Sequence, residues 1–196
     1  MRAELSMGAG ASVNAASDPD AELVARAAAG DRASFGALLE RHYDRMYRIA
    51  WRLTGSRHDA EDVVQDVCCA LVGKIRFFRG EAKFATWLIG ILVNACHDHR
   101  RRLGALARMR QRLSVVVALG ANPDGRGLYR AAWLASGIAR LSPEIRAAVV
   151  LVAGEGLSHA EAAAVLGCAE STVSWRLHAA RKRLRAQMVE EILDVR

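Results

Sequence analysis

The stretch LSPEIRAAVVLVAGEGLSHAEAAAVLGCAESTVSWRLHAARKRL, residues 141–184, decides the fold of the C-terminal half. Ser142 and Pro143 predict the start of one helix, and Ser158 with Glu161 forms the capping box of a second, shorter helix that ends at a glycine. A tight turn and a longer basic helix follow. This order is typical of a helix-turn-helix, in which the last helix enters the major groove of DNA.

The last helix of this stretch has two unlike faces. One is an apolar stripe at helical spacing that predicts contact with a core: Val173, Leu177, Ala180 and Leu184. The other carries hydroxyls, an aromatic ring and cations: Ser171, Ser174, Trp175, His178, Arg181, Lys182 and Arg185. No acidic residue occurs in residues 171–189, so these cations repel one another unless an anion binds them, which favours DNA as the partner. The alternatives are a solvated face for the cations and, for the tryptophan, burial by the linker or by a protein partner.

Composition bounds the class of the chain. Its 196 residues are 52% hydrophobic, which predicts a folded protein with one medium domain or two small ones. Lys and Arg number 28 against 21 Asp and Glu, a net charge of +7 that suits a polyanionic partner. The four cysteines lack CxxC spacing, so we expect reduced thiols that behave as buried small hydrophobes in a cytoplasmic protein.

Several kinds of site are not expected. The segment CHDH, residues 96–99, does not offer the ligand spacing of a metal site, so neither a metal nor a cofactor is predicted. No apolar run approaches the roughly 20 residues that cross a bilayer, and the start has no export leader, so no membrane insertion is predicted. No nucleophile, metal motif or phosphate loop accompanies the carboxylates, so the chain is not expected to be an enzyme.

Four helices are predicted in the N-terminal half. The first begins at DPDAELVARAAAGD, where Asp18 or Asp20 is expected to act as the cap. The second covers residues 33–53, and the third begins at Ser56, which forms a capping box with Asp59. The fourth is FATWLIGILVNACHDHRRR, residues 84–102.

The third helix presents a cluster of carboxylates in a basic protein. Asp62 and Asp66 are four residues apart on one face, with Gln65 beside them, and like charges at that spacing are mildly destabilising. This face is therefore expected to bind a basic partner. Asp59, in contrast, is expected to act at the helix start, where the helix dipole favours an anion.

The fourth helix carries a second stripe beside its core stripe. Lys83, Trp87, Gly90 and Asn94 follow one another at helical spacing. A cation, an aromatic ring, a gap and an amide are what a groove for single-stranded nucleic acid uses: phosphate contact, stacking, room for a base and hydrogen bonding. The alternative is that the tryptophan belongs to the core and the glycine allows close helix packing. Lys83, Asn94 and the cluster at residues 100–102 are harder to bury.

Three segments in this order resemble an extracytoplasmic-function (group IV) bacterial RNA polymerase sigma factor of the sigma-70 family. They are AEDVVQDVCCAL, FRGEAKFATWLIGILVNACHDHRRR and residues 141–184. The resemblance implies an all-α fold in which a helical region-2 domain and a helix-turn-helix region-4 domain are joined by a flexible linker. The expected divisions are a disordered tail at 1–17, region 2 at 18–104, the linker at 105–131 and region 4 at 132–196. Within the linker, SVVVAL (114–119) is expected to dock on an apolar surface.

The resemblance also implies a function and its residues. Such a factor binds RNA polymerase core and directs promoter-specific transcription initiation. Its activity is controlled by an anti-sigma factor. Asp62, Gln65 and Asp66 would dock on the clamp of the largest subunit, and region 4 would meet the flap of the second largest. The minus-10 element would be held by Phe78, Arg79, Lys83, Trp87, Asn94, Arg101 and Arg102. The minus-35 element would be contacted by Ser171, Thr172, Ser174, Trp175, Arg176, His178, Arg181 and Lys182.

Two other classes compete with this interpretation. A stand-alone helix-turn-helix regulator would need only the C-terminal unit, and the acidic cluster with the Trp87 and Asn94 stripe argues against it. A metal- or thiol-dependent enzyme would need ligand spacing that the cysteines and histidines do not have.

Overall fold

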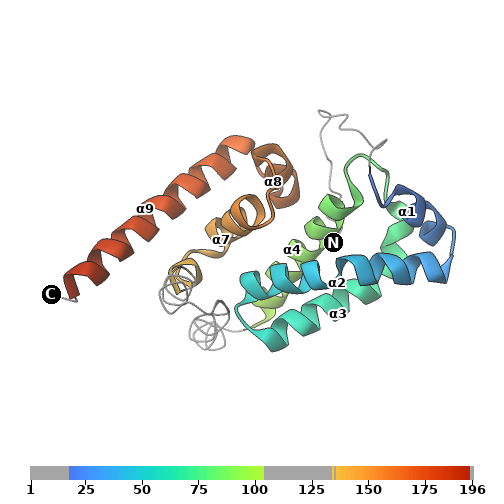
Figure 1. Ribbon diagram of the computed structural model, residues 1–196, viewed down its shortest axis with the longest axis horizontal. Coiled ribbons are helices and arrows are strands. Elements are labelled where there is room, and N and C mark those ends of the chain that lie inside the picture. Colours follow the sequence, from blue (N-terminus) through green and yellow to red (C-terminus); the bar gives the residue numbers. More distant parts are fainter. Residues whose placement is uncertain (1–17, 104–133, 135, 195–196) are drawn as a thin grey trace.

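The described chain is all-α, as predicted. The computed structural model describes residues 18–103, 134 and 136–194, and those residues contain no strand (Figure 1). The helices are α1 (Ala21–Ala28), α2 (Arg32–Thr54), α3 (Arg57–Lys74), the 3₁₀ turn η2 (Ile75–Phe77), α4 (Phe84–Arg102), α7 (Pro143–Val149), the π-helix η3 (Val150–Gly154), α8 (His159–Leu166) and α9 (Glu170–Asp194).

Several helix ends lie where their local sequence predicts them. The Oδ1 atom of Asp31 accepts from the Ala33 N–H at 3.0 Å and caps α2, whose other end closes on Gly55 with φ 79°. Ser158 and Glu161 form the reciprocal capping box of α8. These ends were predictable because each cap acts within about one turn of its own helix.

Other helix ends match the expectation only in part. The N-cap position of α1 is Asp20, but its side chain makes no capping bond. Ser142 occupies the N-cap of α7 and Pro143 its first turn, as predicted, although the Ser142 side chain makes no capping bond. The helix expected from LSPEIRAAVVLVAG stays α-helical only to Val149 and then widens into the π-helix η3. Wide turns of this kind shift the side chains that follow them.

The first four helices surround one apolar core. α2 packs on α1, α3 and α4, and α3 packs on α4. The largest fully buried side chains come mainly from these helices: Phe84, Leu38, Met46, Ile49, Leu71, Leu88, Ile89, Leu92, Val63, Val64 and Val67. Each helix thus buries one stripe and leaves its opposite face to solvent, which is what the helical spacing in the sequence predicts.

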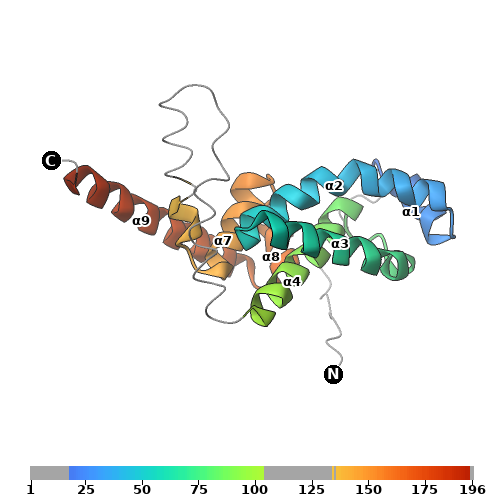
Figure 2. The same ribbon diagram turned by 90° about the horizontal axis from the view of Figure 1, so that it is seen from below.

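The C-terminal helices pack on the first four rather than standing apart. α8 contacts α4, α7 contacts α2, and one buried apolar cluster contains residues from both halves of the chain. α9 begins beside α8 and runs away from α1–α4 toward the C-terminus in both views (Figures 1 and 2). The sequence did not predict this closed arrangement.

Two sets of polar contacts join the halves. Glu155, whose side chain is only 8% exposed, lies 2.9 Å from Nε of Arg45 and 3.2 Å from Nη1 of Arg52. The buried guanidinium of Arg146 donates to the carbonyl oxygen of Leu53 at 3.2 Å and to several carbonyls just before α7. These donors and acceptors satisfy charges that burial would otherwise penalise.

Some expectations fall on residues outside the described ranges. The tail at 1–17, the linker at 105–131 and the segment SVVVAL lie there, so the expected domain boundaries stay predictions. Within the described residues, no helix is both long enough and apolar enough to cross a membrane.

Candidate nucleic-acid and protein interfaces

The acidic face of α3 is exposed. Asp62, Gln65 and Asp66 all face solvent, while Val63, Val64 and Val67 of the same helix are buried. The nearest recorded ion-pair partner of Asp62 is Nε2 of His58, at 3.7 Å. Neither Asp62 nor Asp66 forms an ion pair with a Lys or Arg of the described residues. Two carboxylates and an amide are therefore available to a basic partner.

Asp59 does not belong to this face. Its N–H donates to Oγ of Ser56 at 3.3 Å, so Ser56 caps the helix, and Asp59 lies in the first turn as expected. The Asp59 carboxylate lies 3.2 Å from Nε2 of His99 on α4. The contact joins α3 to α4, so Asp59 has a structural role.

The stripe on α4 combines exposed and packed residues. Lys83 and Asn94 are exposed, whereas Trp87 is half-buried against the rings of Phe78 and Phe84, at 5.1 and 5.8 Å between centroids. A side-chain carbon built at Gly90 would meet no atom within 4 Å. The tryptophan is thus part of the core's edge, but the glycine is not there for close helix packing; it borders open space.

The loop before α4 rests on this aromatic cluster. Phe78 is half-buried and meets Phe84 edge-on at 5.7 Å, whereas Arg79 is exposed with Glu81 3.9 Å away. Gly80 has φ 70°, a conformation that side chains rarely adopt. The loop therefore displays cations above an aromatic floor.

The charged side chains at the two ends of α4 interact with different acidic residues. Arg101 and Arg102 are exposed at the C-terminal end, and Nη2 of Arg101 lies 2.5 Å from Oδ1 of Asp98. At the N-terminal end, the charge of Lys83 acts on Glu161 of α8. The pKa of Glu161 is lowered by its hydrogen bonds to the backbone and hydroxyl of Ser158 and, to a smaller extent, by the Lys83 charge.

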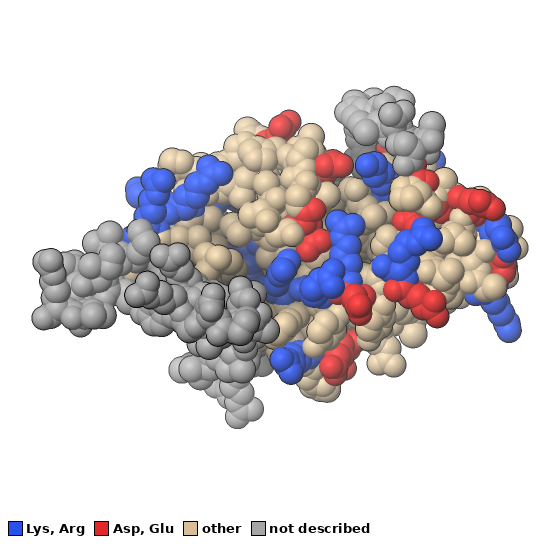
Figure 3. Space-filling model, viewed as in Figure 1, with Lys and Arg blue, Asp and Glu red and all other residues tan. Residues whose placement is uncertain are grey.

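The predicted DNA-facing residues of α9 mostly face solvent. Figure 3 shows Lys and Arg side chains over the visible middle of α9, whereas Lys, Arg, Asp and Glu lie side by side over α2. Trp175 is 63% exposed, which agrees with its predicted outer position, and Thr172 is half-buried. The remaining exposed members are Ser171, Ser174, His178, Arg181 and Lys182.

Arg176 is the exception on α9. Its side chain is half-buried, and Nη1 lies 3.6 Å from Sγ of Cys168 in the turn between α8 and α9. The reason is angular: Arg176 lies only about 60° around the helix from Val173, whereas Trp175 lies about 200° away. Arg176 therefore lies between the core stripe and the outer face, and its contact with the minus-35 element stays a prediction.

One polar contact of this face was not predicted. Oγ of Ser174 lies 3.0 Å from Nδ1 of His159, the first residue of α8. The contact fixes the start of α8 against α9. The sequence carried no signal for it, because the two residues are 15 positions apart and belong to different helices.

The cysteines follow the prediction only in part. All four are free thiols, and burial raises the pKa of Cys96 to about 12, so that it stays protonated. Cys96 is buried, but Cys68 and Cys168 are half-buried and Cys69 is exposed, which corrects the expectation that all four are buried. Among the described residues no group of three or more His, Cys, Asp and Glu is arranged to hold a metal ion.

Comparison with known proteins identifies the family of the chain. The family described as "Sigma-70 region 2" matches residues 38–105, and "Sigma-70, region 4" matches residues 131–184. The ECF RNA polymerase sigma factor SigM of Mycobacterium tuberculosis is 38% identical over 167 residues, which cover 84% of this chain and 82% of that protein. The chain belongs to the extracytoplasmic-function group of the sigma-70 family.

Solved sigma factors share the fold of this one. CnrH, in complex with the cytosolic domain of CnrY, aligns with a TM-score of 0.65 and 31% identity over 87% of this chain and 97% of that one. The sigma factor RpoE of Bartonella quintana, in complex with the anti-sigma factor NepR, aligns with a TM-score of 0.62 and 26% identity over 79% of this chain and 96% of that one.

The matched ranges locate the surfaces within this sigma factor. The acidic face of α3 and the α4 stripe lie in region 2, and the outer face of α9 lies in region 4. A stand-alone regulator would need only the second match, so the sigma-factor interpretation is confirmed over that alternative. α1 and the residues before it precede the region-2 match.

Proposed function

We propose that this sigma factor docks on RNA polymerase core through α3, holds the minus-10 element at the start of α4 and contacts the minus-35 element with α9. The observation that carries the proposal is the exposed face of Asp62, Gln65 and Asp66 in an otherwise basic protein. Charge-assisted contacts of two carboxylates with a basic helix would relieve their mutual repulsion. The corresponding surface is the clamp of the largest polymerase subunit.

The minus-10 proposal rests on what the start of α4 offers to a single strand. Arg79 and Lys83 are exposed cations, Gly90 borders open space, and Asn94 is an exposed amide. An unstacked base needs a cation for its phosphate, a cavity and a hydrogen-bonding edge. Phe78 and Trp87 would form the floor of the site, and Arg101 and Arg102 would meet the phosphates further along.

The minus-35 proposal rests on the outer face of α9. Ser171, Ser174 and Trp175 lie near its N-terminal end, which meets base edges in helix-turn-helix complexes. Thr172, His178, Arg181 and Lys182 continue the surface, and its cations would neutralise phosphates. Arg176 would act through the turn that it packs on. Region 4 would also meet the flap of the second-largest subunit.

The partners of the structural relatives suggest the control of this chain. CnrH was solved with the cytosolic domain of CnrY, and RpoE with the anti-sigma factor NepR. We propose that an anti-sigma factor likewise restrains this protein, which acts in the cytoplasm where polymerase works. Its task is recognition, which requires neither a cofactor nor a catalytic residue.

A charge reversal tests the docking proposal. Asp62→Lys with Asp66→Lys should weaken binding to polymerase core by about a hundredfold or more, because two attractive contacts become repulsive. The matched control is Glu40→Lys with Asp44→Lys, an exposed acidic pair at the same spacing on α2. Competition against labelled wild-type chain for purified core measures both. A double α3 variant that competes like wild type would overturn the proposal.

Asn94→Ala tests the minus-10 proposal separately. Holoenzyme with this variant should bind duplex promoter normally but form about tenfold less open complex, because an unstacked base loses its amide partner. Permanganate reactivity of a promoter mapped by run-off transcription measures melting, and duplex binding is the internal control. Unchanged melting would remove Asn94 from the site.

A further inference from the structure

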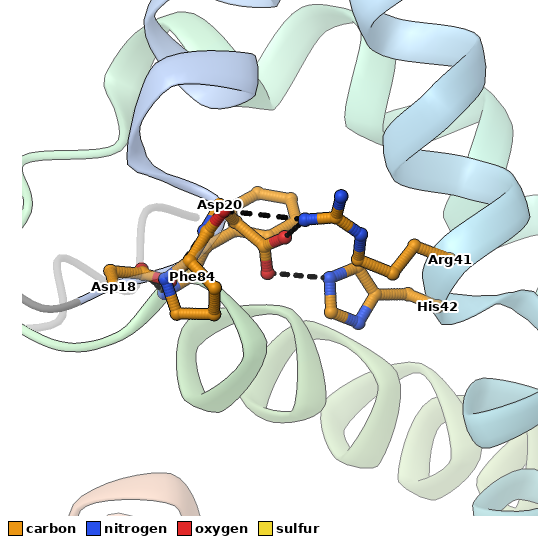
Figure 4. A network of polar contacts seen from close by, with 6 residues as sticks. Asp18, Asp20, Arg41, His42 and Phe84 are labelled. Atoms are coloured by element: carbon orange, nitrogen blue, oxygen red, sulfur yellow. Dashed lines mark hydrogen bonds and ion pairs between the residues drawn. The ribbon is translucent and has the colours of Figure 1, made fainter.

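The start of α4 is capped by a residue far away in the sequence. Lys83, at the N-cap position, makes no side-chain capping bond. Instead, Oδ2 of Asp18 accepts from the Phe84 N–H at 2.6 Å, across 66 positions of the chain (Figure 4). The first N–H groups of a helix have no partner within it, and a carboxylate there also meets the positive end of the helix dipole.

Asp18 is itself held in place by the neighbouring Asp20, which contacts α2. Its Oδ1 accepts from the Asp20 N–H at 3.0 Å. Asp20, only 2% exposed, lies 2.7 Å from Nε2 of His42 and 2.5 Å from Nη1 of Arg41, and the same Arg41 nitrogen lies 3.3 Å from the carbonyl oxygen of Pro19. The segment 18–20 is therefore bound to α2 and cannot shift without breaking buried polar contacts.

The same network reaches the aromatic floor of the loop. The His42 ring lies 5.6 Å from the ring of Phe84, whose side chain is fully buried. Phe84 in turn meets Phe78 and Trp87, on which the loop before α4 rests. Backbone and ring of Phe84 are thus held from two sides, by Asp18 and by His42.

We infer that Asp18 is a positioning residue for the minus-10 site: by capping α4 it holds the loop of residues 78–83 and the first turn of α4 in the geometry that receives a base. This inference rests on the proposed function of that loop. Asp18 precedes the region-2 match, which begins at residue 38, so the role follows from the contacts alone. An ordered loop binds a strand without first losing its own conformational freedom.

The test compares three variants of the full chain in holoenzyme. Asp18→Ala removes the acceptor, and Asp18→Asn keeps an oxygen that can accept the Phe84 N–H. The matched control is Asp31→Ala, which removes the cap of α2 in the same domain but away from the loop. The probe is a fork-junction DNA with the non-template strand of a promoter mapped by run-off transcription with the wild-type chain.

Asp18→Ala should reduce binding of the fork-junction probe and open-complex formation by about fivefold to tenfold, while binding to polymerase core changes less than about twofold. Asp18→Asn should recover most of the loss. Asp31→Ala should lower the melting temperature of the protein as much as Asp18→Ala does. It should leave binding of the fork-junction probe and open-complex formation unchanged. Hydrogen exchange of the first turn of α4 should be faster in Asp18→Ala than in Asp18→Asn.

Three results would overturn the inference: normal promoter opening by Asp18→Ala, an equal defect in Asp31→Ala, or no recovery in Asp18→Asn. Failure of the proposed function has a different signature. If Asn94→Ala also opens promoters normally, the minus-10 assignment itself is wrong. If Asn94→Ala is defective while Asp18→Ala is normal, only the positioning role falls.

Discussion

Two tryptophans lie on helices proposed to contact promoter DNA, and their surroundings differ. Trp87 of α4 is half-buried between Phe78 and Phe84, whereas Trp175 of α9 is 63% exposed. Trp87 lies about 60° around α4 from the buried Phe84, whereas Trp175 lies about 200° around α9 from the buried Val173. The same residue type therefore serves as the floor of a loop in one place and as a free surface in the other.

The difference comes from the angle of each ring around its helix and from the segments that approach the helix. A loop returns over the start of α4 and brings Phe78 onto Trp87. At the start of α9, His159 of α8 contacts Ser174, and the neighbouring indole stays 63% exposed. An aromatic ring on a helix surface thus becomes structural only where another segment covers it.

The largest expected effect is on stability. Trp87→Ala should lower the free energy of unfolding by about 2–3 kcal/mol, because a half-buried ring leaves a cavity beside Phe78 and Phe84. Trp175→Ala should change it by less than about 0.5 kcal/mol, as expected for an exposed side chain. Urea denaturation of both variants checks the comparison. Equal losses would mean that the two rings are packed alike.

The next effect is on promoter selectivity. Trp175→Ala should alter the preference at one or two minus-35 positions, with a loss of about 1–3 kcal/mol at each, because the indole is placed to cover thymine methyl groups. Binding to a set of single-base promoter variants measures this. If selectivity is unaltered but an inhibitory protein complex weakens, the ring is an anchor for a protein partner.

Gly90→Ala separates stability from DNA binding on α4. The new methyl group meets no atom within 4 Å, so the variant should be more stable by about 0.5–1 kcal/mol through its higher helix propensity. The methyl group would also narrow the open space proposed for a base, so promoter melting should weaken. Thermal unfolding measures the stability of the protein, and permanganate reactivity measures promoter melting. A stabilised variant that melts the promoter normally would argue that no base enters the space beside Gly90.

Two arginines sharpen the comparison on α9. Arg181→Ala should weaken all promoter sequences alike and flatten the salt dependence of binding by about one unit, as for one phosphate contact. Arg176→Ala should change the salt dependence less, because its guanidinium lies against Cys168 rather than on the outer face. Affinities measured across a range of salt concentrations distinguish them, and equal slopes would return Arg176 to the DNA surface.

The smallest expected effect is on the pH dependence of stability, and it differs between two histidines. Burial, with a contribution from the nearby Arg100 charge, lowers the pKa of His97 on α4, whereas His178 on α9 is exposed. The unfolded chain therefore binds a proton at His97 before the folded chain does, and stability is lost as pH falls below about 6.5. His97→Gln should reduce this loss between pH 7 and 5, and His178→Gln should not. Unfolding curves at several pH values test the pair.

The helices and their outer faces were predictable from the sequence. α4 and the capping box of α8 lie at the predicted residues, and Asp62, Gln65, Asp66 and Trp175 are exposed as their spacing indicates. Caps act within a turn, and the face of a residue follows from 100° per position, so both are local properties of the chain.

Only the tertiary structure decided which of these faces are covered and what holds them. Asp18 caps α4 across 66 positions, and Glu155 meets Arg45 and Arg52 across 110 and 103. Neither contact has a local signal, because each depends on how separate helices pack. The sequence alone determined the helices and the surfaces available to partners, whereas packing decided that Trp87 lies under a loop and that the two halves share a core.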